Sequence, residues 1–162
     1  MGTIMSIQLE RMPIRMRAID CHCHIYPAKI AKKAVESVGE FYGIHMDLDD
    51  GTSDTLLDAS RDVPIEKHFI YSVATRPEQV ESINNFIASE CEKHPEFVGF
   101  MTLHQDYKDP ESEIERARAM GLRGMKLHPD TQMVDMDDPR LMTIYEIIEG
   151  KMPIVIHCGD YR

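Results

Sequence analysis

The stretch Ile19-Asp20-Cys21-His22-Cys23-His24 follows a short apolar run and decides how the rest of the chain is interpreted. Side chains alternate between the two faces of a β-strand. In an extended chain Asp20 would therefore share one face with both histidines, and the two cysteines would share the other. Two imidazoles side by side are good ligands for zinc, manganese, iron or nickel. A metal site here would use the histidine pair or the cysteine pair, because an extended strand cannot turn all four side chains to one ion.

The composition indicates a globular protein and excludes several classes of partner. The 162 residues are 43% hydrophobic and 28% charged, and the net charge is −10. An acidic chain of this kind is not expected to bind nucleic acid or an anionic membrane. No apolar run approaches the roughly 18 residues of a membrane span. The four cysteines form no disulfide framework, which predicts a reducing, cytoplasmic location. Residues 1–15 are interpreted as an N-terminal extension and residues 16–162 as one domain.

Short apolar segments alternate with amphipathic ones along the chain. Strands are predicted at 16–21, 68–73, 97–103, 124–127 and 153–157, and helices at 28–42, 53–61, 76–93, 110–120 and 138–149. In the first helix Ile30, Ala34 and Val38 recur at helical spacing. Such alternation predicts an α/β fold with a parallel sheet, either a barrel or an open doubly wound sheet. A histidine pair stands where a nucleotide-binding fold would have a Gly-rich loop, which disfavours that class.

Five of the eight histidines fall at the carboxyl ends of the predicted strands, where parallel α/β folds collect their functional groups. They are His22, His24, His104, His128 and His157. The pair on the first strand is interpreted as metal-binding, and His157 as a third ligand. Asp20 is expected to orient the histidines from behind. The cysteines of the first strand are expected to pack as small apolar residues towards the helices.

Two basic residues at the strand ends also suggest chemistry. Lys126 shares the parity of His128, and an inward-pointing lysine needs a carboxylate, a substrate anion or a metal-site role. Arg76 follows the second strand, and His104 the third. We interpret Lys126 and His128 as candidate catalytic residues, and Arg76 and His104 as candidates to bind a substrate carboxylate or stabilise an oxyanion.

Three motifs resemble the metal-dependent hydrolases of the amidohydrolase superfamily. They are Asp20-x-His22-x-His24, the stretch GLRGMKLHP at 121–129 and the stretch IVIHCG at 154–159. The closest branch is the amidohydrolase-2 family, which includes enzymes similar to aminocarboxymuconate-semialdehyde decarboxylase. The resemblance implies a distorted (β/α)8 TIM barrel in which His22, His24 and His157 bind the metal. The family usually adds a histidine on strand six and an aspartate on strand eight, and neither strand is found here.

The resemblance also sets the expected fold and function. A complete barrel needs about 250 residues, so we expect a (β/α) barrel truncated after about five strands. Its open edges would favour a homo-oligomer or pairing with the missing C-terminal half. The expected activity is hydrolysis of an amide, ester or lactone of a small-molecule substrate, with a divalent metal as cofactor. Zinc is the first choice, and manganese, iron and nickel are alternatives. The alternative functions are nonoxidative decarboxylation of a small unsaturated or aromatic acid, and metal binding by an inactive half barrel.

Overall fold

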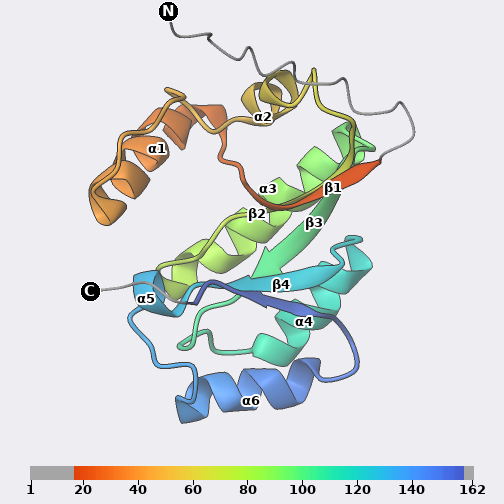
Figure 1. The fold of residues 1–162 in the computed structure, drawn as a ribbon. Coiled ribbons are helices and arrows are strands. Elements are labelled where there is room, and N and C mark those ends of the chain that lie inside the picture. The colour runs from red at the N-terminus through yellow and green to blue at the C-terminus, as the bar shows by residue number, and fades with distance from the viewer. Residues whose placement is uncertain (1–16, 159–162) are drawn as a thin grey trace, which may run out of the picture.

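Five parallel strands form one curled sheet in a computed structural model that describes residues 17–158 (Figure 1). The strands are β1 (Ala18–His24), β2 (Ile65–Tyr71), β3 (Phe97–Thr102), β4 (Gly124–Leu127) and β5 (Ile154–Ile156). They lie side by side in chain order, and every neighbouring pair is parallel. This is the parallel α/β sheet that the alternating sequence pattern predicts, and its curl fits the truncated (β/α) barrel that the resemblance implies. The predicted extension at 1–15 lies outside the described residues.

Helices connect successive strands, as the sequence pattern predicts. They are α1 (Ala28–Tyr42), α2 (Ser53–Ala59), the short 3-10 helix η1 (Pro77–Gln79), α3 (Val80–Lys93), α4 (Pro110–Ala119), α5 (Pro129–Gln132) and α6 (Pro139–Ile148). Four of them begin at side-chain caps, in which Thr52, Asp109, His128 and Asp138 accept backbone N–H groups. No helix within residues 17–158 is long and apolar enough to cross a membrane.

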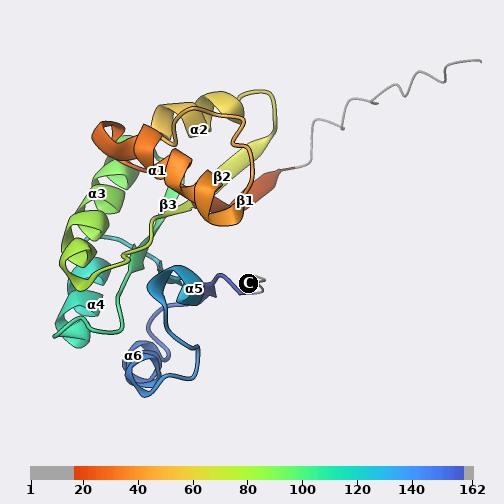
Figure 2. The ribbon, with the colours of Figure 1, turned by 90° about the vertical axis from the view of Figure 1, so that its left-hand side faces the viewer.

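The apolar core lies between the sheet and the helices α3, α4 and α6, which Figure 2 shows on the outer side of the curled sheet. β4 has all four of its residues buried. The buried face of α1 differs from the predicted one by one residue. Ala31 and Val35 are buried there, whereas Ile30 is 49% exposed. Helical spacing alone identified the helix correctly, and it placed the apolar face one position out.

β1 is not regularly extended, which corrects the predicted alternation of its side chains. Asp20 pairs with His68 of β2, and Cys23 pairs with Ile70, so three steps along β1 match two steps along β2. A bulge of this kind reverses the parity of the residues that follow it. Cys21 is consequently exposed and not packed under the helices, while Cys23 is buried as predicted.

A buried asparagine ties the carboxyl end of β3 to α3. The Asn84 side chain accepts the N–H of Thr102 at 2.8 Å and donates to the carbonyl of Thr102 at 3.1 Å. It also donates to Glu113 of α4 at 2.7 Å, and Arg116 pairs with the same carboxylate. Asn84 thus completes the hydrogen bonds of the strand end from which the chain enters the site.

We expect Asn84→Ala to lower the free energy of unfolding by about 2–3 kcal/mol. The substitution removes the side-chain partner of both backbone groups of Thr102, and it takes one of two hydrogen bonds from Oε1 of Glu113, which Arg116 still contacts. The matched control is Glu92→Ala on the exposed side of the same helix, which we expect to change the free energy by about 0.5 kcal/mol or less. Urea unfolding followed by circular dichroism measures both. Equal effects of the two substitutions would contradict the role of Asn84.

Candidate functional site

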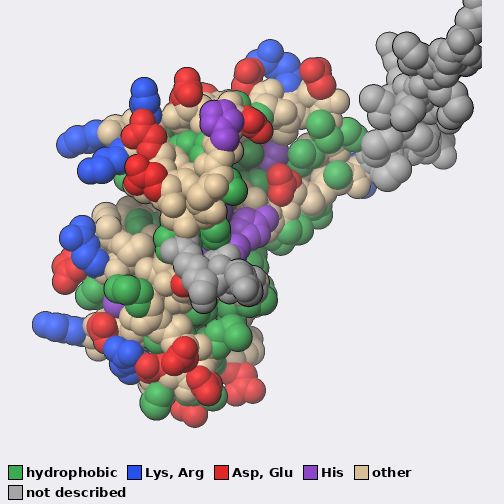
Figure 3. Space-filling view, turned by 60° about the vertical axis from the view of Figure 1, so that its left-hand side comes forward, with side chains coloured by type: hydrophobic (Ala, Val, Ile, Leu, Met, Phe, Trp, Pro, Cys, Tyr) green, Lys and Arg blue, Asp and Glu red, His purple; other side chains and the backbone are tan. Residues whose placement is uncertain are grey.

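Histidines from three strands meet at the carboxyl edge of the sheet. The ring centroids of His22 and His24 lie 5.3 Å apart, and those of His22 and His157 lie 6.0 Å apart. The ring of His128 stacks on that of His157 with 4.2 Å between centroids and 5° between planes. Figure 3 shows histidine side chains, in purple, at the surface near the middle of this face. The structure therefore brings together all three predicted metal ligands and one predicted catalytic residue.

A tyrosine from the end of β2 lies against the first two histidines. The Tyr71 ring contacts His22 and His24 edge-on, at centroid distances of 5.5 and 4.9 Å. Its hydroxyl donates to the carbonyl of Cys21 at 2.9 Å. The Tyr71 ring thus supports both imidazoles and is itself held by β1. Sequence analysis did not single out this residue, although it stands at a strand end.

Lys126 is fully buried beside these groups. The ammonium has no hydrogen-bond partner among the described residues, and it lies 5.0 Å from the centroid of the Tyr71 ring. A cation over an aromatic face gains some attraction, but less than a carboxylate would provide. Burial lowers the pKa of Lys126 to about 8. The side chain therefore points into the site as its parity predicted, and within residues 17–158 no carboxylate is hydrogen-bonded to it there.

A second tyrosine holds the stacked pair of histidines. The Tyr42 hydroxyl lies 2.7 Å from Nε2 of His128 and 3.4 Å from Nε2 of His157. Nδ1 of His128 accepts the backbone N–H of Thr131 at 3.4 Å, which orients the ring from its other side. Tyr42 is the last residue of α1, so this helix reaches the site with its carboxyl end. No local sequence pattern indicates this contact, beyond the position of Tyr42 at the end of the predicted helix.

The donor set fits a divalent ion. Burial is the largest influence that lowers the pKa of His22 and of His24, and the positive charges of Lys126 and neighbouring histidines act in the same direction. Together they lower the pKa of His24 to about 3, whereas the Asp20 carboxylate opposes the lowering at His22. Both imidazoles are therefore neutral near pH 7, the form that binds metal. Two imidazoles on one tetrahedral ion have centroids about 5 Å apart. The ring centroids of His22 and His24, 5.3 Å apart, match this distance. The centroid of His157 lies somewhat farther away, 6.0 Å from that of His22.

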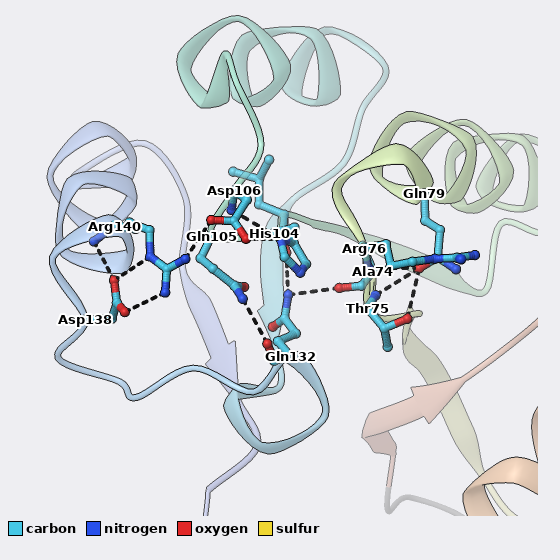
Figure 4. A network of polar contacts seen from close by, with 11 residues as sticks. Ala74, Thr75, Arg76, Gln79, His104, Gln105, Asp106, Gln132, Asp138 and Arg140 are labelled. Atoms are coloured by element: carbon cyan, nitrogen blue, oxygen red, sulfur yellow. Dashed lines mark hydrogen bonds and ion pairs between the residues drawn. The ribbon is translucent and has the colours of Figure 1, made fainter.

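Arg76 and His104 lie in a separate polar network, which Figure 4 shows. His104 accepts the N–H of Asp106 at 3.2 Å, and Asp106 pairs with Arg140 at 2.6 Å. Burial lowers the pKa of His104, although the Asp106 carboxylate opposes the change. Arg76 begins η1 with its side chain exposed. These two residues reach the same edge of the sheet, but no contact with the histidine cluster is found among the described residues.

Gln132 joins the ends of three strands and was missed by sequence analysis. Its amide nitrogen donates to the carbonyls of Ala74 and Leu103, at 3.0 and 2.7 Å, and its side-chain oxygen accepts the N–H of His128 at 2.9 Å. The groups that it binds follow β2, β3 and β4. Gln132 thereby sets the spacing of the loops that carry Arg76, His104 and His128. It lies in the short helix α5, which the sequence pattern did not indicate.

The Asp20 side chain contacts the backbone of His22 and not its imidazole. Its carboxylate accepts the His22 N–H at 3.0 Å. A hydrogen bond from either imidazole to the Asp20 carboxylate, by which Asp20 was expected to orient the histidines, is not found within residues 17–158. The Asp20 carboxylate lies instead near Cys23 and His68. The potential metal-ligand atoms of these three residues all lie within 4.8 Å of one another. Burial, with the Asp20 carboxylate adding to it, raises the pKa of the Cys23 thiol to about 12.

Comparison with known proteins gives a family match and two similar folds. A family model described as "Amidohydrolase" matches residues 19–161. A protein from Staphylococcus aureus described as an amidohydrolase has a TM-score of 0.65 and 18% identity, over 91% of this chain and 49% of its own. A protein from Acinetobacter baumannii described as a 2-pyrone-4,6-dicarboxylic acid hydrolase, with citric acid bound, has a TM-score of 0.57 and 13% identity, over 88% and 50%. The chain thus spans about half the length of these structures. No curated protein matches it.

We expect Lys126→Met to raise the resistance of the chain to urea at pH 7. The buried ammonium opposes folding, because its pKa falls from 10.5 to about 8 in the folded chain. Between these two values the unfolded chain binds more protons than the folded one, so native stability rises with pH over this window. The advantage of Lys126→Met should therefore be largest below pH 8 and shrink towards pH 10.5.

Urea midpoints measured across this range in metal-free buffer test the prediction, and Lys33→Met on the exposed face of α1 is the control. A constant difference across the range would contradict it.

Proposed function

Because the chain belongs to the amidohydrolase family, we propose that it carries the histidine-rich part of a metal-dependent site that hydrolyses an amide, ester or lactone bond in a small molecule. The observation that carries this proposal is the convergence of His22, His24 and His157 at one edge of the sheet. These residues come from the first and last strands of the described sheet. Two metal-binding imidazoles at one strand end and a third across the curled sheet have no evident packing role.

The three imidazoles would hold a divalent ion, with zinc as the first choice for an all-nitrogen set of this size. Such an ion, when bound, polarises a carbonyl and makes a water molecule more acidic. Tyr71 keeps His22 and His24 in position by packing against both rings. The Asp20 carboxylate fixes the backbone at His22. The chain itself therefore orients the ligands before any ion arrives.

Lys126 and His128 are the candidates for the chemical step. With a pKa of about 8, Lys126 is mostly protonated at pH 7, and its ammonium has hydrogen-bonding capacity that the described residues leave unused. It can donate to a substrate carboxylate or to the oxyanion that forms at the attacked carbon. Because Nδ1 of His128 accepts the Thr131 N–H, the neutral ring carries its proton on Nε2, which donates to the Tyr42 hydroxyl at 2.7 Å. That pair can pass a proton to or from a leaving group that reaches His128.

Arg76 and His104 would contact the more distant part of the substrate. Both follow neighbouring strands, and Gln132 fixes the backbone beside each of them. Arg76 offers an exposed guanidinium, which suits a carboxylate. The similar fold from Acinetobacter baumannii is named for a dicarboxylic acid. A small carboxylic acid that also contains the scissile ester or lactone is therefore the substrate class that we favour.

We expect His22→Ala to weaken divalent-ion binding at the histidine cluster by about a hundredfold or more. Loss of a group that only supports a ligand costs up to about a hundredfold, and loss of a ligand should cost at least as much. Zinc titration by calorimetry, with a chelator in competition, gives the affinity. The matched control is His45→Ala, which removes an exposed histidine outside the cluster and should leave the affinity unchanged. Equal affinities for the two variants would exclude His22 as a ligand.

We expect the zinc-loaded chain to hydrolyse at least one member of a panel of small esters and lactones that carry carboxylates. The rate should fall to that of buffer with zinc alone in His22→Ala, and should persist in His45→Ala. A pH-stat records the acid released. If the chain binds zinc through His22 but hydrolyses no member of the panel, the hydrolase activity is wrong for this chain and its family membership still stands.

A further inference from the structure

Three potential metal ligands meet at the β1–β2 pair, away from the histidine cluster. Sγ of Cys23 lies 3.7 Å from Nδ1 of His68, and the Asp20 carboxylate completes a group whose ligand atoms are all within 4.8 Å of one another. A tetrahedral zinc ion places a sulfur and a nitrogen ligand about 3.6 Å apart. The thiol and imidazole already have that spacing. Cys23 and His68 are buried, and Asp20 is half-buried.

The β1 bulge creates this grouping. Asp20 pairs directly with His68, and the extra residue in β1 brings Cys23 back to the side that Asp20 occupies. In a regular strand two residues three positions apart would point to opposite faces. The bulge therefore separates the donors of one strand into two sets. His22 and His24 lie against Tyr71 at the strand ends, while Asp20 and Cys23 lie against His68.

The surroundings of His68 resemble those of a metal-binding histidine. Its Nδ1 faces Cys23, and its Nε2 lies 3.4 Å from the Ser60 hydroxyl just after α2. Ser60 in turn donates to the carbonyl of Leu56 at 2.9 Å, so its oxygen is free to accept from the imidazole. A ligating histidine usually donates its second ring N–H in this way, which fixes its tautomer. Phe97 packs edge-on against the same ring.

We propose that Asp20, Cys23 and His68 form a second metal site, which takes a single zinc ion or another divalent ion that accepts sulfur. One thiolate, one carboxylate and one neutral imidazole balance the charge of a divalent ion, so the loaded site is neutral inside the protein. The mixture of sulfur, nitrogen and oxygen donors suits zinc over magnesium or calcium. Binding expels the thiol proton of Cys23.

A thiol–imidazole hydrogen bond alone would account for the contact between Cys23 and His68. That hydrogen bond involves neither the Asp20 carboxylate, which accepts the His22 N–H and also brings a ligand atom within 4.8 Å of the thiol and the imidazole, nor Ser60 on the other nitrogen of the ring. The site is structural in character, because two of its ligands are buried and it joins β1 to β2. It does not depend on the proposed hydrolase function.

Cobalt absorption tests the site, because a thiolate ligand gives Co²⁺ an intense charge-transfer band in the near ultraviolet and imidazole ligands do not. We expect this band in the native chain titrated with CoCl₂. It should persist in His22→Ala, which lacks a ligand of the histidine cluster. It should also persist when the other cysteines, Cys21, Cys91 and Cys158, are all replaced by serine. Cys23→Ser should remove it, and His68→Ala should weaken cobalt binding at this site at least tenfold.

Three outcomes would overturn the proposal. One is the absence of the band from the native chain at saturating cobalt, a reading that needs no substitution and so does not depend on whether Cys23→Ser folds. Another is a band that survives in Cys23→Ser. The third is loss of the band in His22→Ala, which would assign the thiolate to the histidine cluster. Failure here leaves zinc binding by the histidine cluster intact in Cys23→Ser, so the two proposals can fail separately.

Discussion

Parallel pairing of the strands in chain order is the constraint on which the structure depends. It places the carboxyl ends of all the strands at the same edge of the sheet. The backbone groups just after these ends lie beyond the last hydrogen bonds between the strands. Buried groups of this kind need partners. Asn84 supplies them at the end of β3, and Gln132 supplies them after β2, β3 and β4. The functional edge is therefore held together by amide side chains as well as by strand pairing.

The electrostatics at this edge oppose stability. The fully buried ammonium of Lys126 and the neutral imidazoles of His22 and His24 lie together, and no carboxylate among the described residues is hydrogen-bonded to the ammonium. The remainder of β4 is buried among apolar side chains, which holds Lys126 where solvent cannot reach it. A folded protein keeps such an arrangement only when the surrounding packing is strong enough to impose it. An anionic substrate or a metal-bound anion would relieve it, which is a physical reason for the site to bind one.

Much of the fold could be predicted from the sequence, because strands and helices alternate and each has its own apolar period. The predicted gathering of histidines followed from the same rule, since strand ends in a parallel sheet share one edge. Side-chain direction was less predictable. A bulge depends on the register with a partner strand, so Cys21 was placed on the wrong side of β1. Gln132 and Tyr42 act across the sheet, through contacts that no local pattern records. The face of α1 was misplaced because an apolar stripe shows only approximately which side packs inward.

The bulge in β1 makes the number of residues in that strand as important as their identity. Removal of Cys21 would restore regular alternation and still leave Asp20 and Cys23 on one side of β1, because two steps along β1 would then match two steps along β2. Insertion of one further residue between Asp20 and Cys23 would instead turn the side chains beyond it to the other face. The thiol would then leave Asp20 and His68. A family member that lacks the extra residue could therefore keep both groups of side chains, whereas one with a further residue would have to give up one of them.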